Sequence, residues 1–139
     1  MRRTIVHFLA GLSLSIPAHV ALGEEVVVIG HPQVPKADRV TVQRIFTGRV
    51  VSIGQQPVEP VNLPVGNPVR EDFLQAYLEQ NDQQYTGYWL VRRYVGKGAP
   101  PQELGSVDEV IKYIQATPGA IGYVPVSKVP RGANIVFRR

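Results

Sequence analysis

Cysteine is absent from the 139-residue sequence, and this absence excludes several chemistries at once. Without thiols the chain has no disulfide framework, no cysteine zinc site, no thiol nucleophile and no N-terminal cysteine for a lipid anchor. Histidine is scarce as well: the chain has three, and His31 is the only one that follows Gly23. Residues 24–139 offer neither a second histidine nor a cluster of carboxylates to complete a metal site with His31, so we expect no metal site.

Basic residues outnumber acidic residues only slightly. Fifteen basic residues stand against eleven acidic ones, a formal net charge of +4, and Arg2 and Arg3 supply half of that excess. A balance so close to neutral does not favour binding to nucleic acid or to an anionic membrane. Hydrophobic residues make up 44% of the chain, which suits one folded domain, and 13 glycines and 12 prolines predict many turns.

The segment 1–23 has the pattern of a secretory signal peptide. The basic pair Arg2 and Arg3 precedes an uncharged, mostly apolar stretch that ends at Pro17, and this stretch is shorter than the roughly 18 to 20 residues that span a bilayer. Small residues then predict cleavage before Glu24 or, as the second choice, after Ala18. We therefore expect an exported product without membrane insertion, located in the periplasm of a Gram-negative cell.

Residues 24–139 alternate between β-branched runs and helical spacing. The pattern predicts strands at 26–29, 50–53, 58–63, 120–124 and 133–137, and helices around 42–46, from 67–68 onward, at 82–95 and at 107–116. Strands at both ends with helices between them predict a single α/β or α+β domain, with a small mixed sheet flanked by helices. Pro60 predicts an edge or a bulge in its strand.

Capping residues mark three of the helix starts. Thr41 precedes the first helical pattern, and Ser106 with Glu109 has the spacing of a capping box before the last one. Asn67 followed by Pro68 is the clearest start, because asparagine accepts from free backbone N–H groups and proline leaves no N–H unpaired. The apolar faces of these elements predict the core: Val27, Ile29, Ile45, Phe46, Phe73, Tyr77, Trp89, Val110, Ile111, Ile114, Ile121 and Val124.

Three segments of the sequence resemble a known family. They are Arg44-Ile45-Phe46-Thr47-Gly48, the stretch 61–73 in which a strand leads through a turn into a helix, and Thr117-Pro118-Gly119-Ala120-Ile121-Gly122-Tyr123-Val124. Together they resemble the phosphate-binding proteins of ABC transporters, in the type-two periplasmic binding protein superfamily. The resemblance covers nearly all of residues 24–139 and implies the fold of one lobe of such a protein.

The sequence departs from the family pattern in two respects. Family members are longer, with two lobes that close on the ligand, whereas this chain has room for one. Their phosphate loop is rich in glycine, serine and threonine, whereas the corresponding stretch here, 64–70, has no hydroxyl. The resemblance therefore implies the architecture of a binding-protein lobe, with at most weak binding of phosphate.

The start of the helix after Gly66 is the candidate ligand site. Gly66, Asn67, Val69 and Arg70 would offer backbone N–H groups, an amide and a guanidinium to a small oxyanion. An ordinary capped helix that carries a surface arginine accounts for the same residues, and we expect Arg70 near the surface.

Other residues give weaker candidates. His31 follows the first strand, where binding folds often meet ligands, although a plain loop role is favoured. An aromatic and basic group could stack nucleobases or carbohydrate, but its helical spacing favours core packing; it comprises Tyr85, Tyr88, Trp89, Arg92, Arg93 and Tyr94. Because no carboxylate pair and no serine with a nearby base is placed for catalysis, we expect neither an enzyme nor a cofactor.

Two functions remain open at this point. The first is a non-catalytic solute-binding module that holds phosphate or another oxyanion weakly, in connection with ABC-type uptake. The second is a periplasmic scaffold or accessory subunit that reuses the lobe without a solute and contacts an envelope protein. A homodimer would restore a two-walled cleft.

Overall fold

The computed structural model describes residues 23–139. The predicted signal peptide at 1–23 lies almost wholly outside the described residues, so it stays a prediction. The elements in chain order are β1 (Val26–Gly30), α1 (Arg39–Phe46), β2 (Ser52–Ile53), β3 (Gln56–Pro57), β4 (Glu59–Asn62), α2 (Pro68–Phe73), the π-helix η1 (Leu74–Leu78), α3 (Asp82–Tyr94), β5 (Gln102–Glu103), α4 (Val107–Ala116), β6 (Ala120–Pro125), the 3₁₀ turn η2 (Val126–Lys128) and β7 (Asn134–Phe137).

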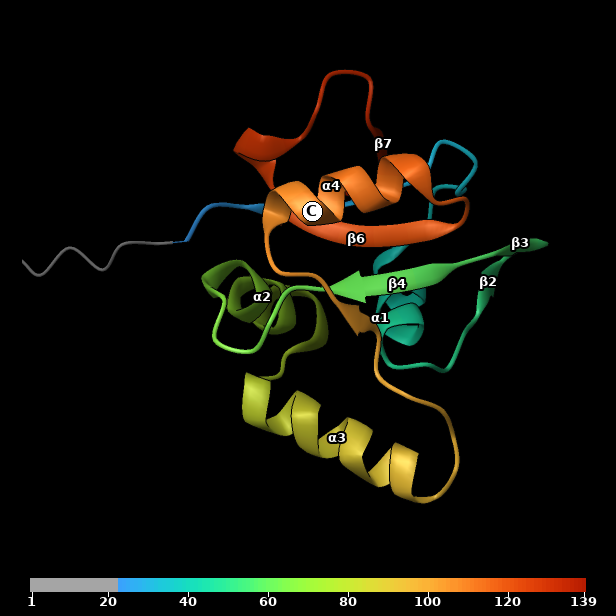
Figure 1. Cartoon of the computed structure of the whole chain (residues 1–139), viewed down its shortest axis with the longest axis vertical. Coiled ribbons are helices and arrows are strands. Elements are labelled where there is room, and N and C mark those ends of the chain that lie inside the picture. The colour runs from blue at the N-terminus through green and yellow to red at the C-terminus, as the bar shows by residue number, and fades with distance from the viewer. Residues whose placement is uncertain (1–22) are drawn as a thin grey trace, which may run out of the picture.

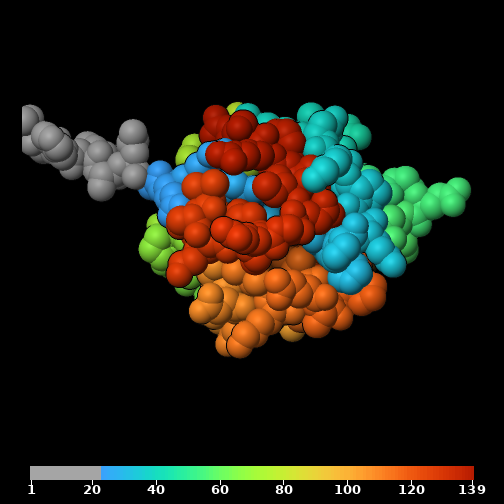
Figure 2. Space-filling model, turned by 90° about the horizontal axis from the view of Figure 1, so that it is seen from above, coloured from blue at the N-terminus to red at the C-terminus, as the bar shows by residue number. Residues whose placement is uncertain are grey.

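Five strands form one mixed sheet in the order β5-β4-β6-β1-β7, which confirms the predicted fold class. Strand β4 runs parallel to both β5 and β6, whereas β1 runs antiparallel to β6 and β7. The remaining strands, β2 and β3, pair as a short hairpin. Figure 2 shows this hairpin, in green, projecting from the end of the molecule opposite the blue N-terminal segment.

Helices cover both faces of the sheet, with α4 on one face and α1 and α2 on the other (Figure 1). Alternation along β6 explains this arrangement, since neighbouring residues of a strand point to opposite faces. Gly122 faces α4, where a Cβ would lie 3.0 Å from side-chain carbons of Val110 and Ile114. Tyr123 faces α2 and stacks on Phe73, with ring centroids 4.0 Å apart.

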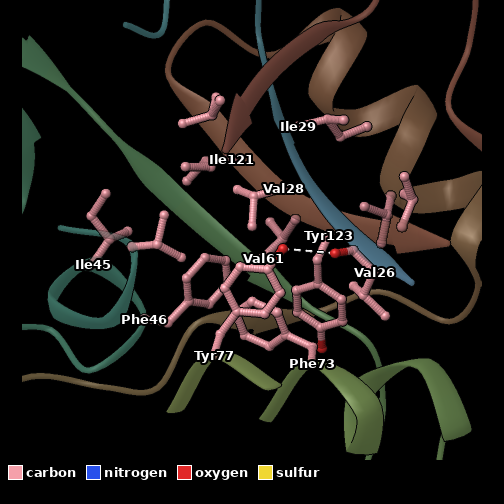
Figure 3. Packing of buried hydrophobic residues seen from close by; sticks show 14 of the residues in the cluster. Val26, Val28, Ile29, Ile45, Phe46, Val61, Phe73, Tyr77, Ile121 and Tyr123 are labelled. Atoms are coloured by element: carbon pink, nitrogen blue, oxygen red, sulfur yellow. Dashed lines mark hydrogen bonds between the residues drawn. The ribbon is translucent and has the colours of Figure 1, made fainter. Parts of the chain in front are cut away.

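The core lies mainly between the sheet and α1, α2 and η1 (Figure 3). Eleven of the twelve predicted core residues are buried, and Ile111 is the exception, because it is only partly buried on α4. Tyr77 lies in this core and donates a 2.7 Å hydrogen bond to the carbonyl of Val26, drawn as a dashed line in Figure 3. The hydroxyl thus finds a partner without leaving the apolar layer.

Local chemistry differs from the prediction at three places. Helix α1 begins earlier than expected, and its cap is Asp38, which accepts from the N–H of Thr41; Thr41 is not the cap. At α4, Ser106 accepts from the N–H of Glu109, but the Glu109 carboxylate returns to Gly105, one residue before the position that a capping box requires.

The third difference concerns the helix that starts at Pro68. It changes after Phe73 into the π-helix η1, which ends at Glu79 in the left-handed conformation.

Strand β4 is interior to the sheet rather than at its edge, which Pro60 had predicted as one of two alternatives. At Pro60, however, it pairs only with β6, because β5 begins alongside Val61, so the missing N–H costs no ladder bond.

Candidate functional site

A tight turn joins β4 to α2 and sets the start of the helix. Gly66 has a left-handed φ of 86°, and the N–H of Asn67 donates to the carbonyl of Pro64 at 3.1 Å. The Asn67 side chain accepts from the N–H groups of Val69 at 2.9 Å and Arg70 at 3.4 Å. The predicted cap is confirmed, and it already engages two of the donors expected to face an oxyanion.

Arg70 is buried, so the expectation of a surface arginine is wrong. Its side chain is 3% exposed, and its Nε donates to Asp82 Oδ1 at 2.6 Å. Its Nη1 donates to Glu103 Oε1 and to the carbonyl of Leu63, each at 3.0 Å. The two carboxylates come from α3 and β5, which lie next to α2 only after folding. The local sequence around α2 therefore contains no sign of this ion-pair network.

Asp82 also binds the turn that precedes α2. Its second oxygen, Oδ2, accepts from the N–H of Gly66 at 3.3 Å while Oδ1 holds Arg70. Two of the four residues predicted to hold an oxyanion, Gly66 and Arg70, are thus bridged by a carboxylate of the chain itself. A charge-assisted bond to a guanidinium is among the stronger hydrogen bonds in proteins.

A buried polar network lies behind Arg70 at the end of β4. Asn62 is 1% exposed, donates to the hydroxyl of Tyr85 at 3.1 Å and accepts from the hydroxyl of Tyr123 at 3.0 Å. The Tyr123 hydroxyl also accepts from the N–H of Leu63, and the Tyr85 hydroxyl donates to the carbonyl of Phe46. The network fixes the end of β4, and hence the turn that begins α2.

Burial controls the ionisation of this network. Desolvation raises the pKa of Tyr85 and, more strongly, the pKa of Tyr123 above the ordinary value for tyrosine. Both hydroxyls therefore keep their protons at neutral pH and remain able to donate. The arrangement suits a structural network that holds Asn62 in place.

A pocket of about 200 Å³ lies beside the network, between α3 and the segment that leads into β5. Buried residues of the network line it together with more exposed residues of α3 and the following loop. The lining comprises Asn62, Arg70, Tyr85, Thr86, Trp89, Leu90, Arg93, Pro100, Pro101 and Glu103.

The weaker candidates take structural places. His31 lies in the loop after β1, where its Nδ1 accepts from the N–H of Gln33 at 3.4 Å. Within residues 23–139, no group of three or more histidine, aspartate or glutamate side chains is placed to hold a metal ion. In the aromatic group, Tyr85 and Trp89 are buried and Tyr88 donates to the carbonyl of Thr47, whereas Tyr94 is exposed.

Sequence reasoning missed Asn62, Asp82 and Glu103 as members of this site. Asn62 carried a usable signal, because an amide within an otherwise apolar strand end requires partners when it is buried. Asp82 was indistinguishable from an ordinary acidic residue in the first turn of a helix. Glu103 gave no signal at all, since β5 is two residues long and has no periodicity.

Two solved structures have a similar fold. A protein from Clostridium perfringens, assigned as a phosphate ABC transporter substrate-binding protein and solved with bound phosphate, is 19% identical with a TM-score of 0.61. An ABC-type phosphate transport receptor from Vibrio cholerae is 14% identical with a TM-score of 0.63. The alignments cover 81% of this chain but only 44% and 45% of those chains. The chain thus has the fold of part of such a binding protein, and it spans less than half the length of either.

No protein-family model matches the sequence, and no curated protein matches it either. Among the helices of residues 23–139, none has both the length and the apolar character needed to cross a membrane.

Proposed function

We propose that this chain is a non-catalytic periplasmic interaction module, a scaffold or accessory subunit that keeps the binding-protein fold without holding a solute at α2. The proposal rests on one observation above all. The Asp82 carboxylate binds both Gly66 and Arg70, the donors that an oxyanion at this helix start would need.

Electrostatics supports the same conclusion. Arg70 contributes one positive charge, whereas Asp82 and Glu103 lie against it with two negative charges. A phosphate brought to this point would meet a net negative surrounding, and it would have to displace hydrogen bonds to charged groups worth about 1.5 to 3 kcal/mol each. Such a site disfavours an anion.

A weak oxyanion site linked to ABC-type uptake is the second candidate. It is supported by the similar structure from Clostridium perfringens, which is described with bound phosphate. In this case phosphate would take the place of the Asp82 carboxylate beside Gly66, Asn67, Val69 and Arg70. A homodimer would then supply the second wall that the chain itself does not provide.

Export is part of the proposal. The predicted signal peptide at 1–23 and the similarity of the fold to ABC-transporter substrate-binding proteins both support an exported mature chain of residues 24–139, and we propose the periplasm as its location. An envelope protein is the expected partner, and we propose no role in nucleic-acid binding.

Isothermal titration with phosphate and with sulfate tests the proposal. We expect no heat of binding from either anion at concentrations up to the millimolar range. A dissociation constant of about a millimolar or tighter, about −4 kcal/mol or more favourable, would overturn the interaction module in favour of the solute-binding candidate. In that case Arg70→Ala, shown by circular dichroism to be folded, should abolish the binding, while Lys112→Ala on α4, a charge on another element, should leave it unchanged.

A further inference from the structure

Helix α3 has an exposed apolar side. Its inner side packs through Tyr85 and Trp89, which are 1% and 5% exposed. The outer side of its second half and the residue that ends it carry large apolar side chains that contact solvent. These are Leu90, Val91, Tyr94 and Val95, exposed by 69%, 64%, 92% and 56%. Four such residues within one and a half turns form a patch of the kind that marks an interaction site.

The segment that carries this patch has charge of one sign, and Glu103, which lines the adjoining pocket, is paired with Arg70. Between Gln83 and Gln102 the sequence contains Arg92, Arg93 and Lys97 and no acidic residue. Arg92 is held inward by hydrogen bonds to the carbonyls of Gly48 and Lys97. Arg93 and Lys97 are exposed. We call Leu90, Val91, Arg93, Tyr94, Val95 and Lys97 together the α3 surface.

The α3 surface continues into a concavity. Leu90 and Arg93 also line the 200 Å³ pocket, whose far side is formed in part by Pro100 and Pro101. An apolar patch beside a pocket is suited to a protein partner, because binding energy concentrates where one side chain fills such a pocket.

We propose that the α3 surface binds an acidic segment of a partner protein, which places an apolar side chain in the pocket between Leu90 and Pro100. This inference rests on the proposed interaction module and names its binding face and the chemistry of its partner. Carboxylates of the segment would face Arg93 and Lys97, and its apolar residues would cover Val91 and Tyr94.

Charge and shape argue against the other occupants. A symmetric pair formed by two α3 surfaces would bring Arg93 and Lys97 of both copies into one interface without any carboxylate from either surface, and like charges at an interface are costly. A lipid surface would neutralise the basic residues, but it offers no defined side chain to fill the pocket.

Selection of random peptides displayed on phage against the purified protein tests this assignment. We expect enriched peptides that combine aspartate or glutamate with leucine, phenylalanine or tryptophan. The strongest of them, made synthetically with a fluorescent label, should bind at least about tenfold more weakly to Leu90→Ser, Tyr94→Ser and Arg93→Glu. Binding should also fall with added salt.

Two matched variants serve as controls. Val40→Ser changes an exposed valine of α1, and Lys112→Glu reverses an exposed charge on α4. Both should bind the peptide like the unmodified protein. Circular dichroism and thermal melting of every variant establish that a loss of binding does not come from unfolding.

Four results would overturn the assignment: no enriched peptide, enriched peptides without acidic residues, equal loss in the control variants, or no loss in the α3 variants. Dimerisation in analytical ultracentrifugation that Tyr94→Ser abolishes would identify a second copy as the occupant instead. Binding to phosphatidylglycerol vesicles that Arg93→Glu abolishes would identify a membrane. The anion titration distinguishes failure of the peptide-binding proposal from failure of the proposed function. A positive phosphate titration overturns the interaction module regardless of the result of the peptide selection.

Discussion

The Nε atom of Arg70 lies 2.6 Å from Oδ1 of Asp82 and joins the first turn of α2 to the first residue of α3. The same carboxylate reaches back to the N–H of Gly66, so one aspartate ties the turn, the arginine and the next helix together. A helix start offers N–H groups that suit an anion, and here the Asp82 carboxylate occupies that position.

Removal of the negative charge at Asp82 should open the helix start to anions. In Asp82→Asn, phosphate would no longer meet a net negative surrounding, and removal of about 1.4 kcal/mol of repulsion increases affinity tenfold. We expect phosphate binding to become measurable by titration at millimolar concentration, where the unmodified protein gives no heat.

Asp108→Asn on α4 is the matched control, since it removes an equal charge at another helix start and should not produce binding. If a folded Asp82→Asn protein gives no heat of binding with phosphate, the Asp82 carboxylate is not what excludes the anion.

Arg70→Ala should destabilise the fold strongly. It leaves the Asp82 and Glu103 carboxylates without their cation, and it leaves the carbonyl of Leu63 without its donor. Because the two carboxylates are 17% and 50% exposed, water lowers the cost below that of a fully buried pair, to about 2 to 3 kcal/mol. Urea unfolding measures this change, and a loss below about 1 kcal/mol would mean that water replaces the guanidinium. Arg131→Ala, at an exposed loop position, should stay within about 0.5 kcal/mol.

The fold was predictable from the sequence wherever local chemistry determines it. Asn67 and Pro68 begin α2 as expected, and Gly122 marks the place where α4 packs closely on β6. Periodicity also placed α3 within a residue of its observed bounds. In each case the signal and its structural consequence lie within a few residues of each other.

The site was less predictable, because it depends on long-range contacts. Asp82 and Glu103 reach Arg70 from 12 and 33 residues away, and neither distance follows from a repeat or a capping pattern. The π-helix η1 was missed for a related reason: Tyr77 within it donates to the carbonyl of Val26, 51 residues away, and a contact of this range leaves no sign in the local sequence.

Trp89→Ala should cost about 3 to 5 kcal/mol of unfolding free energy, because the indole ring is 5% exposed and its removal leaves a large cavity. Tyr94→Ala provides the comparison within the same helix, since Tyr94 is 92% exposed and should change stability by less than about 0.5 kcal/mol. Both values come from urea unfolding. Equal effects would show that α3 packs through a different side from the one described.

Export should remove the segment 1–23. We expect the N-terminal sequence of the protein from the periplasmic fraction to begin at Glu24, because Ala21 and Gly23 are small residues of the kind that a signal peptidase accepts. A start at His19 would support the alternative cleavage after Ala18. A soluble periplasmic protein that retains Met1 would contradict the signal-peptide prediction.

Alkaline pH should destabilise the protein through its buried tyrosines, and Tyr77 makes this testable. Burial, helped by the nearby Glu25 carboxylate, raises the pKa of Tyr77 from 10.0 to about 12. In the unfolded chain the hydroxyl loses its proton near pH 10, whereas in the folded protein it keeps the proton until about pH 12. The folded state therefore binds more protons across this window, so stability that is fully present below pH 10 is lost as the pH rises towards 12.

Urea unfolding across this pH range measures the slope. Tyr77→Phe removes the titrating group, so its unfolding free energy should fall less steeply with pH than that of the unmodified protein, while Tyr123 and Tyr85 maintain the remaining dependence. At neutral pH the same variant should lose about 1 kcal/mol, because the carbonyl of Val26 loses its donor. Tyr94→Phe alters an exposed hydroxyl and should reproduce the unmodified curve. Identical slopes for Tyr77→Phe and the unmodified protein would show that Tyr77 titrates with an ordinary pKa, as a tyrosine in contact with water does.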